Sequence, residues 1–290
     1  MHVVSAALLA GLVAIAVTVA IERLGGRRGG LLGTLPTTIV PAALGFWWAS
    51  PTITDFQDAL WVVPAGMMLN ATFLLFWREV PRRLPAWSLL ARLSAMVALS
   101  MGAWLVLAIV LLLATESYRD TGLPMLAFGW GFFLLAVLLG LLACLRSVAA
   151  PAGARRVGPA TLLSRGALAA GAVGLAVAMV TVLGPLAAGI VSIFPAIFLT
   201  TIVALWWSQG EAVPAGAIGP MMLGSTSVSA FALLAASIMP LAGPLLGAIA
   251  AWLGAAMLVT LPAWWLLVRV ARAASPGRLG GARGVSASME

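Results

Sequence analysis

Long apolar runs, separated by short segments that contain polar residues, glycine or proline, fill nearly the whole of this 290-residue sequence. A helix needs about 20 predominantly apolar residues to cross the hydrocarbon of a bilayer. By that length the pattern predicts about nine spans, at 3–21, 30–50, 56–77, 86–114, 123–145, 164–183, 186–207, 212–238 and 244–268. The spans leave no room for a soluble domain of useful size. We therefore expect an all-α polytopic membrane protein.

Two glycine–proline breaks separate spans that would otherwise merge. Gly184-Pro185 divides the sixth span from the seventh, and the segment 239–244 divides the eighth from the ninth. The first apolar run meets Glu22 and Arg23 directly, with no basic segment before it and no small-residue cleavage site. We therefore interpret it as a retained helix and not as a signal peptide.

Composition and charge support this interpretation and orient the chain. The sequence is 63% hydrophobic and 8% charged, whereas a soluble domain carries roughly 25% charged residues. The net charge is +8, and fifteen of the sixteen basic residues, all arginine, fall on one side of the nine spans. The positive-inside rule then predicts an outer N-terminus and a cytoplasmic C-terminus. Arginines in short loops do not indicate nucleic-acid binding, and the lysine-free, alanine-rich composition suggests a bacterial cytoplasmic membrane.

Two stretches of the chain are repeated. Four pairs of residues match at an offset of 159, namely Gly30/Gly189, Pro36/Pro195, Trp47/Trp206 and Trp48/Trp207. A second set matches at an offset of 154, where Met67, Met68, Leu69 and Thr72 correspond to Met221, Met222, Leu223 and Thr226. The alternative is chance, because the chain is rich in Ala, Leu and Gly. The shared order of the two matches favours a true repeat.

The repeat implies an inverted 4+1+4 architecture. Spans 1–4 correspond to spans 6–9, and the fifth span connects them, so the two copies lie in opposite orientations in the membrane. The predicted divisions are 1–114 for the first repeat, 115–162 for the connector, 163–272 for the inverted repeat and 273–290 for a tail rich in Gly, Ser, Ala and Arg. Such a tail cannot bury a core and is expected to be disordered.

Prolines inside the spans mark where helices should break. A proline removes a backbone N–H, so nearby carbonyl groups inside lipid need other partners. We expect such breaks at Pro36 and Pro41 in the second span, Pro195 in the seventh and Pro220 in the eighth, with Pro64 in the third.

Small polar side chains lie within a few turns of these prolines and form one predicted cluster in each half. Neutral oxygen groups at mid-depth can coordinate a dehydrated cation or a small polar solute. The alternative is that the hydroxyl groups bond their own backbone and that the amide of Asn70 bonds a neighbouring helix. The candidate substrate-binding residues are Thr37, Thr38, Asn70, Thr72, Ser192, Thr200, Thr201, Ser225, Thr226 and Ser229, with Ser227 beside them.

Asp58 and Glu211 stand at near-equivalent positions of the two halves, at helix entrances on opposite sides. We expect both at the surface, as gate carboxylates at the two mouths of a cation pathway. The alternative is that they complement the dipoles at helix N-termini. No carboxylate or histidine is predicted at the membrane centre, which disfavours a buried proton relay.

The sequence offers little for enzyme chemistry. His2 is the only histidine and Cys144 the only cysteine, so neither a His/Cys metal set nor a Ser–His pair can be built. Paired mid-membrane aspartates and a phosphate-binding glycine loop are also missing. We expect no enzyme activity, no cofactor and no metal, and a packing role for Cys144.

An inverted repeat with a proline-broken helix in each half is typical of secondary transporters. The prediction is therefore a carrier for a small polar solute or cation, which works by alternating access with its site between spans 2/3 and 7/8. One alternative is an ion or solute channel, and another is a non-transporting membrane subunit or lipid-handling protein. The expected partners are the lipid bilayer and the solute or ion, with no nucleic acid and a homo-oligomer left open.

Overall fold

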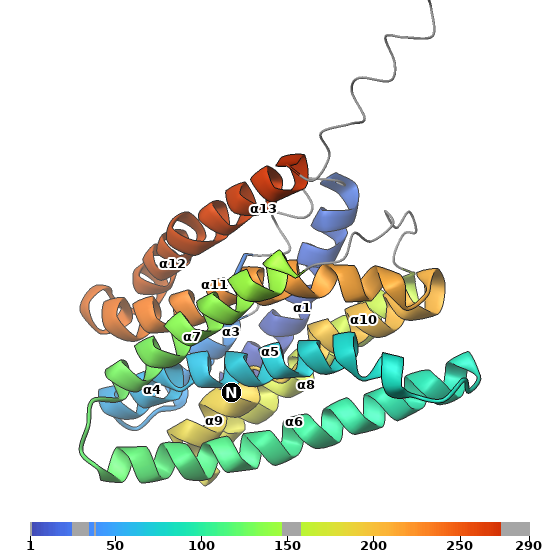
Figure 1. The fold of residues 1–290 in the computed structure, drawn as a ribbon. Coiled ribbons are helices and arrows are strands. Elements are labelled where there is room, and N and C mark those ends of the chain that lie inside the picture. The colour runs from blue at the N-terminus through green and yellow to red at the C-terminus, as the bar shows by residue number, and fades with distance from the viewer. Residues whose placement is uncertain (1, 25–34, 38, 147–157, 274–290) are drawn as a thin grey trace, which may run out of the picture.

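The computed structural model describes residues 2–24, 35–37, 39–146 and 158–273 (Figure 1). These parts of the chain fold into helices, with no strand among them. The elements in chain order are α1 (His2–Leu24), α3 (Val40–Ala49), α4 (Ile53–Trp61), α5 (Val63–Glu79), the short 3-10 helix η1 (Pro81–Arg83), α6 (Leu89–Asp120), α7 (Met125–Leu145), α8 (Pro159–Val182), α9 (Pro185–Ser192), α10 (Ala196–Gln209), α11 (Ala212–Ala242), α12 (Pro244–Ala255), the π-helical turn η2 (Ala256–Thr260) and α13 (Leu261–Ala273).

Seven helical segments of the described residues are long and apolar enough to cross a membrane. They are Ile53–Arg83, Leu89–Asp120, Met125–Leu145, Leu162–Val182, Pro185–Trp207, Ala215–Ala242 and Pro244–Arg269, which fall on the third to the ninth predicted spans. Two shorter apolar helices, Val3–Ala16 and Val40–Ala49, fall on the first two. The expectation of an all-helical, membrane-embedded protein is therefore confirmed.

The fourth predicted span ends too early. α6 continues to Asp120 over 32 residues, so Glu116 and Arg119 lie in its last turns and not in a loop. Polar residues alone do not end a helix. The helix stops near Gly122, which has a φ of 75° that other residues rarely adopt.

Most of the predicted proline breaks are corrected by the structure. Pro36 precedes α3, because the second span becomes helical only at Val40. Pro41 lies in the first turn of α3, where a missing N–H costs nothing, and Pro64 has the same place in α5. Pro220 lies inside α11, which continues through it. At Pro195, by contrast, the chain leaves the helix between α9 and α10.

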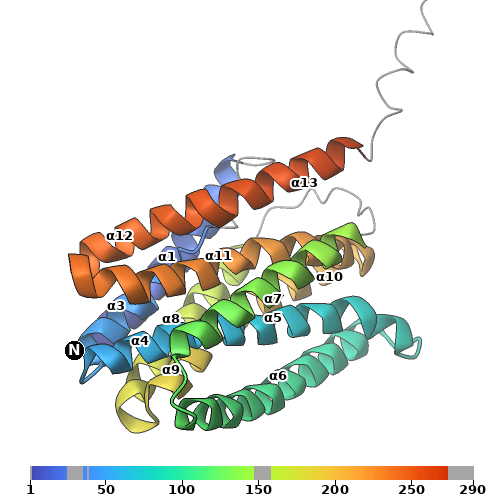
Figure 2. The same ribbon diagram turned by 60° about the vertical axis from the view of Figure 1, so that its left-hand side comes forward.

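α5 and α11 form the centre of the bundle. They pack against each other, and α7 packs against both. The long helix α6 borders one side of the bundle, and the α12–α13 segment borders the opposite side (Figures 1 and 2). Most of the buried apolar residues belong to one continuous core cluster, which includes Phe46, Trp77, Phe231 and Met239.

Glycines let several helices approach backbone to backbone. A Cβ atom on Gly11 of α1 would lie 3.0 Å from the carbonyl oxygen of Gly166 on α8. In the reverse direction, a Cβ atom on Gly166 would lie 3.3 Å from the carbonyl oxygen of Gly11. Gly189 of α9 lies against the backbone of α4 at Ala59, so closely that a Cβ atom would collide with it. Small residues at helix interfaces are the usual means of close packing in membranes.

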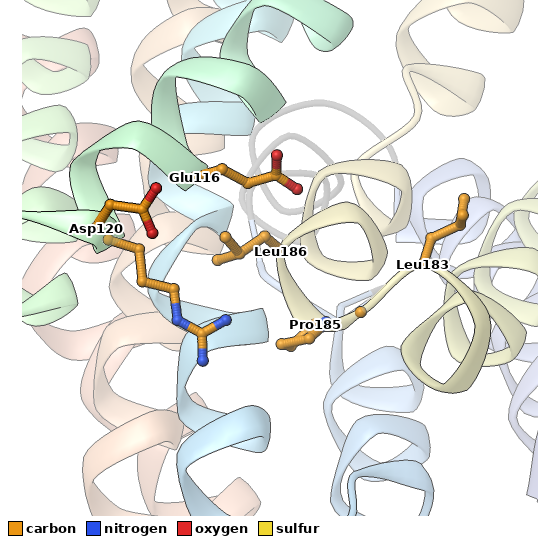
Figure 3. Close-up of a pocket in the computed structure, with 7 residues that line it drawn as sticks. Glu116, Asp120, Leu183, Pro185 and Leu186 are labelled. Carbon is orange, nitrogen blue, oxygen red and sulfur yellow. The ribbon is translucent and has the colours of Figure 1, made fainter.

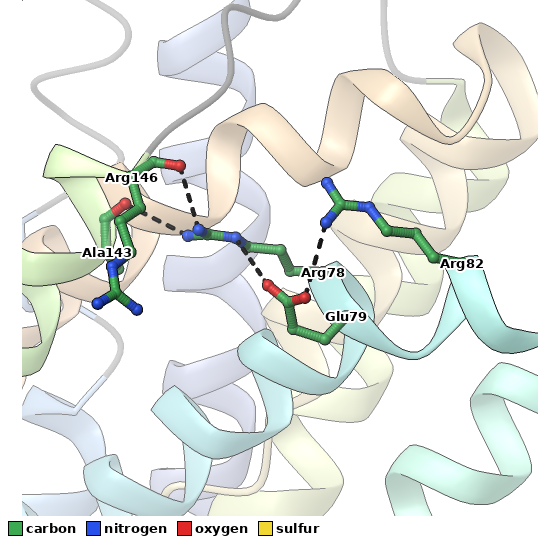
Figure 4. A network of polar contacts seen from close by, with 5 residues as sticks. All are labelled: Arg78, Glu79, Arg82, Ala143 and Arg146. Atoms are coloured by element: carbon green, nitrogen blue, oxygen red, sulfur yellow. Dashed lines mark hydrogen bonds and ion pairs between the residues drawn. The ribbon is translucent and has the colours of Figure 1, made fainter.

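An arginine network joins the C-terminal ends of α5 and α7 (Figure 4). Arg78 donates hydrogen bonds to the carbonyl oxygens of Ala143 at 3.3 Å and of Arg146 at 3.1 Å. Its Nε also lies 3.2 Å from Glu79, which in turn lies 3.7 Å from Arg82. A guanidinium group at a helix C-terminus satisfies carbonyl groups that have no partner within the helix.

Candidate functional site

The break between α9 and α10 is the main irregularity inside the seventh span. α9 ends at Ser192, and Pro195 is the N-cap residue of α10. Pro195 has no N–H to offer, so the carbonyl oxygen of Val191 accepts instead from the N–H of Phe194, at 3.0 Å. Among the backbone hydrogen bonds around this break, none ends on the carbonyl oxygen of Ile193, so this oxygen is open to a side-chain donor.

Asn70 of α5 supplies that donor. Its Nδ2 donates a hydrogen bond to the carbonyl oxygen of Ile193, at 2.8 Å, and also lies 3.7 Å from the sulfur of Met67. Its Oδ1 accepts a hydrogen bond from the indole Nε1 of Trp104 on α6, at 3.0 Å. Asn70 is 3% exposed. This single buried amide therefore ties α5 and α6 to the broken helix.

Trp104 also contacts the break directly. Its ring lies edge-on to Phe194, with 5.5 Å between the ring centroids. Trp104 lies 12 residues after Arg92 and 15 before Arg119 along α6. At 1.5 Å per residue these intervals are about 18 Å and 22 Å. We call Asn70, Trp104, Ile193 and Phe194 the Asn70 cluster. It thus lies beside the middle of α6.

Most of the candidate hydroxyl groups donate to carbonyl oxygens of their own helix, as the alternative interpretation expected. The bonds are Thr72 to Met68 at 3.1 Å, Ser192 to Gly189 at 2.7 Å, Thr200 to Ala196 at 2.8 Å, Ser225 to Met222 at 2.8 Å and Thr226 to Leu223 at 2.7 Å. Thr201 is half-buried on α10, and Thr38 lies outside the described residues. A hydroxyl that donates in this way keeps its oxygen as an acceptor.

Two of the candidate hydroxyl groups are different. The oxygens of Ser229 on α11 and of Thr37 before α3 are buried and have no hydrogen-bond partner among the described residues. Ser229 is fully buried. One turn further along α11, Leu233 contacts Gly129 of α7, which also contacts the backbone of Trp61 on α4. A buried polar atom without a partner costs free energy, so each such atom in a native structure needs an explanation.

An ion pair lies at one end of the bundle, which we call the Asp58 end. Asp58 of α4 lies 3.1 Å from a guanidinium nitrogen of Arg119, near the end of α6. The expectation that Asp58 is an exposed surface residue is wrong, although Asp58 does lie near the start of the third span. It lies within α4 and is only 4% exposed, because α4 packs against α9 and α11.

A cavity of about 280 Å³ opens beside this ion pair (Figure 3). Glu116 and Asp120 line it from α6, and Pro185 and Leu186 line it from the start of α9. Neither Glu116 nor Asp120 has an ion-pair partner within 4 Å among the described residues. Arg119 also lines the cavity but is paired with Asp58, so Glu116 and Asp120 give the lining an acidic character.

A second ion pair lies at the other end of the bundle, the Glu211 end. Glu211 is the N-cap residue of α11 and lies 2.8 Å from Arg92, near the start of α6. Arg92 also donates a hydrogen bond to the carbonyl oxygen of Pro81, at 2.9 Å. The guanidinium carbon lies 5.6 Å from the ring centroid of Trp206 on α10. Trp206 packs edge-on against Trp77, with 5.6 Å between the ring centroids.

The structure thus places one candidate of the first predicted cluster, Asn70, against the helix break of the second half, and it adds three residues that were not among the candidate site residues. Arg92 and Arg119 pair with the two predicted gate carboxylates, and Trp104 binds Asn70. One signal could have pointed to Arg119, because it is the only arginine outside the predicted cytoplasmic side. Arg92 gave no comparable signal, because it is one of the fifteen arginines on the predicted cytoplasmic side, which the positive-inside rule explains.

The described residues contain no group of three or more His, Cys, Asp or Glu side chains that could hold a metal ion. Comparison of the chain with protein-family models, with curated proteins and with solved structures gave no match. The functional argument therefore rests on the contacts, burial and charges of this chain.

Proposed function

We propose that this chain is a secondary membrane transporter, which moves a small polar solute or a cation by alternating access. The observation that carries the proposal is the reciprocal contact of Gly11 on α1 with Gly166 on α8. The two glycines are 155 residues apart, close to the offset of 154 that relates the methionine pairs. Contacts in which each residue of a pair meets the same atoms of the other are expected across a two-fold axis.

The other helix contacts support the same two-fold relationship. If each helix of one half is replaced by its counterpart in the other half, the α1–α3 contact corresponds to the α8–α9 contact. In the same way, the α5–α6 contact corresponds to the α11–α12 contact. The α6–α9 contact likewise corresponds to the α12–α3 contact, while α7 packs against both α5 and α11. Inverted repeats of this kind, with an axis in the membrane plane, are a common design of secondary transporters.

The proposed site lies between α3–α5 and α9–α11, at the level of the Asn70 cluster. The broken helix supplies the carbonyl oxygen of Ile193, and Ser229 and Thr37 supply hydroxyl oxygens that no described residue uses. All of these groups are uncharged, so a neutral polar solute or a monovalent cation fits them better than a highly charged one. A bound solute would give the two buried hydroxyl groups the partners they lack.

The orientation of the chain is part of the proposal. The arginine bias favours a bacterial cytoplasmic membrane with the N-terminus outside. The Asp58 end then faces the exterior and the Glu211 end faces the cytoplasm. The acidic lining of the cavity at the Asp58 end would attract a cation, or the amino group of a solute, from outside.

The experiment uses purified full-length protein in liposomes. Thermal unfolding, followed by the fluorescence of the twelve tryptophans, would first screen Na⁺, K⁺, neutral amino acids and hexoses. Probes that raise the unfolding temperature would then be measured as radiolabelled uptake against concentration. An excess of unlabelled probe inside the liposomes should accelerate uptake of the labelled probe, because a carrier returns faster when it is loaded.

Saturable uptake with this counterflow is the expected result. Single-channel currents, or flux that rises linearly with concentration, would replace the carrier by a channel. Loss of lipid asymmetry in the same liposomes, without uptake of any probe, would favour lipid handling. Failure of every probe to stabilise the protein or to enter the liposomes would overturn the transporter proposal.

A further inference from the structure

The long helix α6 carries one arginine near each of its ends. Arg92 and Arg119 are 27 residues apart on a helix with no interruption. That interval spans about 40 Å at 1.5 Å per residue, more than the roughly 30 Å of bilayer hydrocarbon. The two guanidinium groups therefore lie at opposite ends of the bundle.

Each arginine is paired with a carboxylate from a different half of the chain. Arg119 meets Asp58 of α4 at 3.1 Å, and Arg92 meets Glu211 at the start of α11 at 2.8 Å. Both α4 and α11 belong to the central packing of the bundle. The same helix is thus tied to the first half of the chain at one end and to the second half at the other.

The rest of α6 is attached lightly. It packs mainly against α5, α9 and α10. Like the other helices at the edge of the bundle, α6 is mostly unburied: 28% of its most apolar stretch is buried, the same share as for α7, against 72% for the α4–α5 span. The buried residues form one stripe at spacings of three and four, consisting of Leu93, Met96, Ser100, Trp104, Ala108, Leu111 and Thr115. A segment with few buried contacts is the kind that moves at low cost.

We propose that α6 is a rocking helix whose two ion pairs close the transport path at its two ends and open alternately. This inference rests on the transport function proposed above. Trp104 lies in the middle of the buried stripe and is held by Asn70, which makes it the pivot. A rigid helix that tilts about its middle moves its ends in opposite directions, so one ion pair lengthens while the other stays formed. Both pairs are formed in the structure described here, so in this proposal it represents the state with both ends closed.

The pivot connects this motion to the site. The amide that holds Trp104 also holds the carbonyl group of Ile193 at the helix break. A solute that bonds Ile193 or Asn70 would change the hold on Trp104 and would shift the balance between the two ends. A ligand shifts a conformational equilibrium only if it binds one conformation more tightly than the other. Contact of the solute with Ile193 or Asn70 would provide this difference.

Accessibility of introduced cysteines tests the proposal without knowledge of the solute. In a Cys144→Ala background, Leu186→Cys reports on the Asp58 end, where Leu186 is buried and lines the cavity. Ile202→Cys reports on the Glu211 end, because Ile202 is fully buried one turn before Trp206. Vesicles of each orientation would be treated with a membrane-impermeant thiol reagent, and the labelling rates compared.

Neutral, nearly isosteric substitutions weaken each ion pair. Asp58→Asn should raise labelling at position 186 from the exterior and lower labelling at position 202 from the cytoplasm, by about tenfold each, within the usual range of coupling between two sites. Glu211→Gln should do the reverse. Arg269→Ala is the matched control, since Arg269 on α13 stacks on Trp265 away from both ion pairs. Adding Trp104→Phe should remove the effect at the far reporter.

The far reporter decides between the interpretations. A change at the near reporter alone would mean local loosening, and increased labelling at both ends would mean an open pore. Either result, or no change in both carboxylate variants, would overturn the rocking-helix proposal. Counterflow that persists while labelling is unchanged would remove only this inference. Reciprocal labelling in a protein without uptake or counterflow would remove the transport function and keep the motion.

Discussion

The side-chain amide of Asn70 donates a hydrogen bond to the main-chain carbonyl oxygen of Ile193, 2.8 Å away and 123 residues further along the chain. The bond holds open a break that Pro195 creates between α9 and α10. The same amide accepts from Trp104, so one buried side chain uses its hydrogen-bonding groups on two other helices. The packing of α5, α6 and the broken helix therefore depends on it, and we propose that transport does as well.

Asn70→Leu should abolish transport, keep expression and lower the unfolding temperature. The substitution leaves the Ile193 carbonyl and the Trp104 N–H buried without partners, and each such group costs about 1–3 kcal/mol. Tryptophan fluorescence during heating measures the stability, and counterflow measures the transport. Thr181→Val is the control, because Thr181 is an exposed residue of α8 whose hydroxyl bonds the carbonyl oxygen of Ala178 in its own helix. An unfolding temperature equal to that of the wild type would show that Asn70 does not hold the break.

Ser229→Ala should separate stability from transport. The hydroxyl of Ser229 is buried without a partner, so its removal should leave the unfolding temperature unchanged or raise it. Uptake should fall if that hydroxyl binds the solute. Ser225→Val, on the same helix face, should abolish transport in the same assay. Ser237→Ala, an exposed serine whose hydroxyl bonds Leu233, is the control. Wild-type uptake in both site variants would remove α11 from the binding site.

Pro195→Ala should slow turnover without loss of stability. An alanine restores the missing N–H and lets α9 and α10 join into one helix, and proline costs about 3 kcal/mol relative to alanine inside a helix. The straightened helix would draw the Ile193 carbonyl into its own hydrogen-bond ladder and away from Asn70. The maximal uptake rate and the unfolding temperature would be measured together. Pro220→Ala is the matched change in a helix that already continues through its proline. If the two variants have the same kinetics, the break at Pro195 is only a packing feature.

Gly11→Ile should destabilise the fold, because its Cβ would lie 3.0 Å from the Gly166 carbonyl oxygen and 3.2 Å from the Cβ of Ala170. Overpacking of this kind costs about 1–3 kcal/mol. We expect a lower yield of monodisperse protein in size-exclusion chromatography and a lower unfolding temperature. Gly102→Ile in α6 has open space and should behave like the wild type. Equal behaviour of the two variants would mean that α1 and α8 do not rely on close contact at Gly11.

Much of the helical architecture could be predicted from the sequence, because membrane helices depend on local length and composition. Seven apolar segments fall on predicted spans, and Gly184 and Gly243, both with positive φ, lie at the predicted turns. Helix ends were less predictable. The polar residues from Thr115 to Asp120 continue α6, because no glycine or proline stops it there.

The sequence by itself determined that this protein is a bundle of membrane helices with arginines concentrated in a few loops, since apolar length and charge need no tertiary information. Only the tertiary structure decided which arginines pair with Asp58 and Glu211, that Asp58 is buried, and that Asn70 binds Ile193. These contacts join residues 61 to 123 positions apart. The local sequence of a helix shows how apolar the helix is. Which other helix it contacts depends on the side chains that packing brings to the same depth in the membrane.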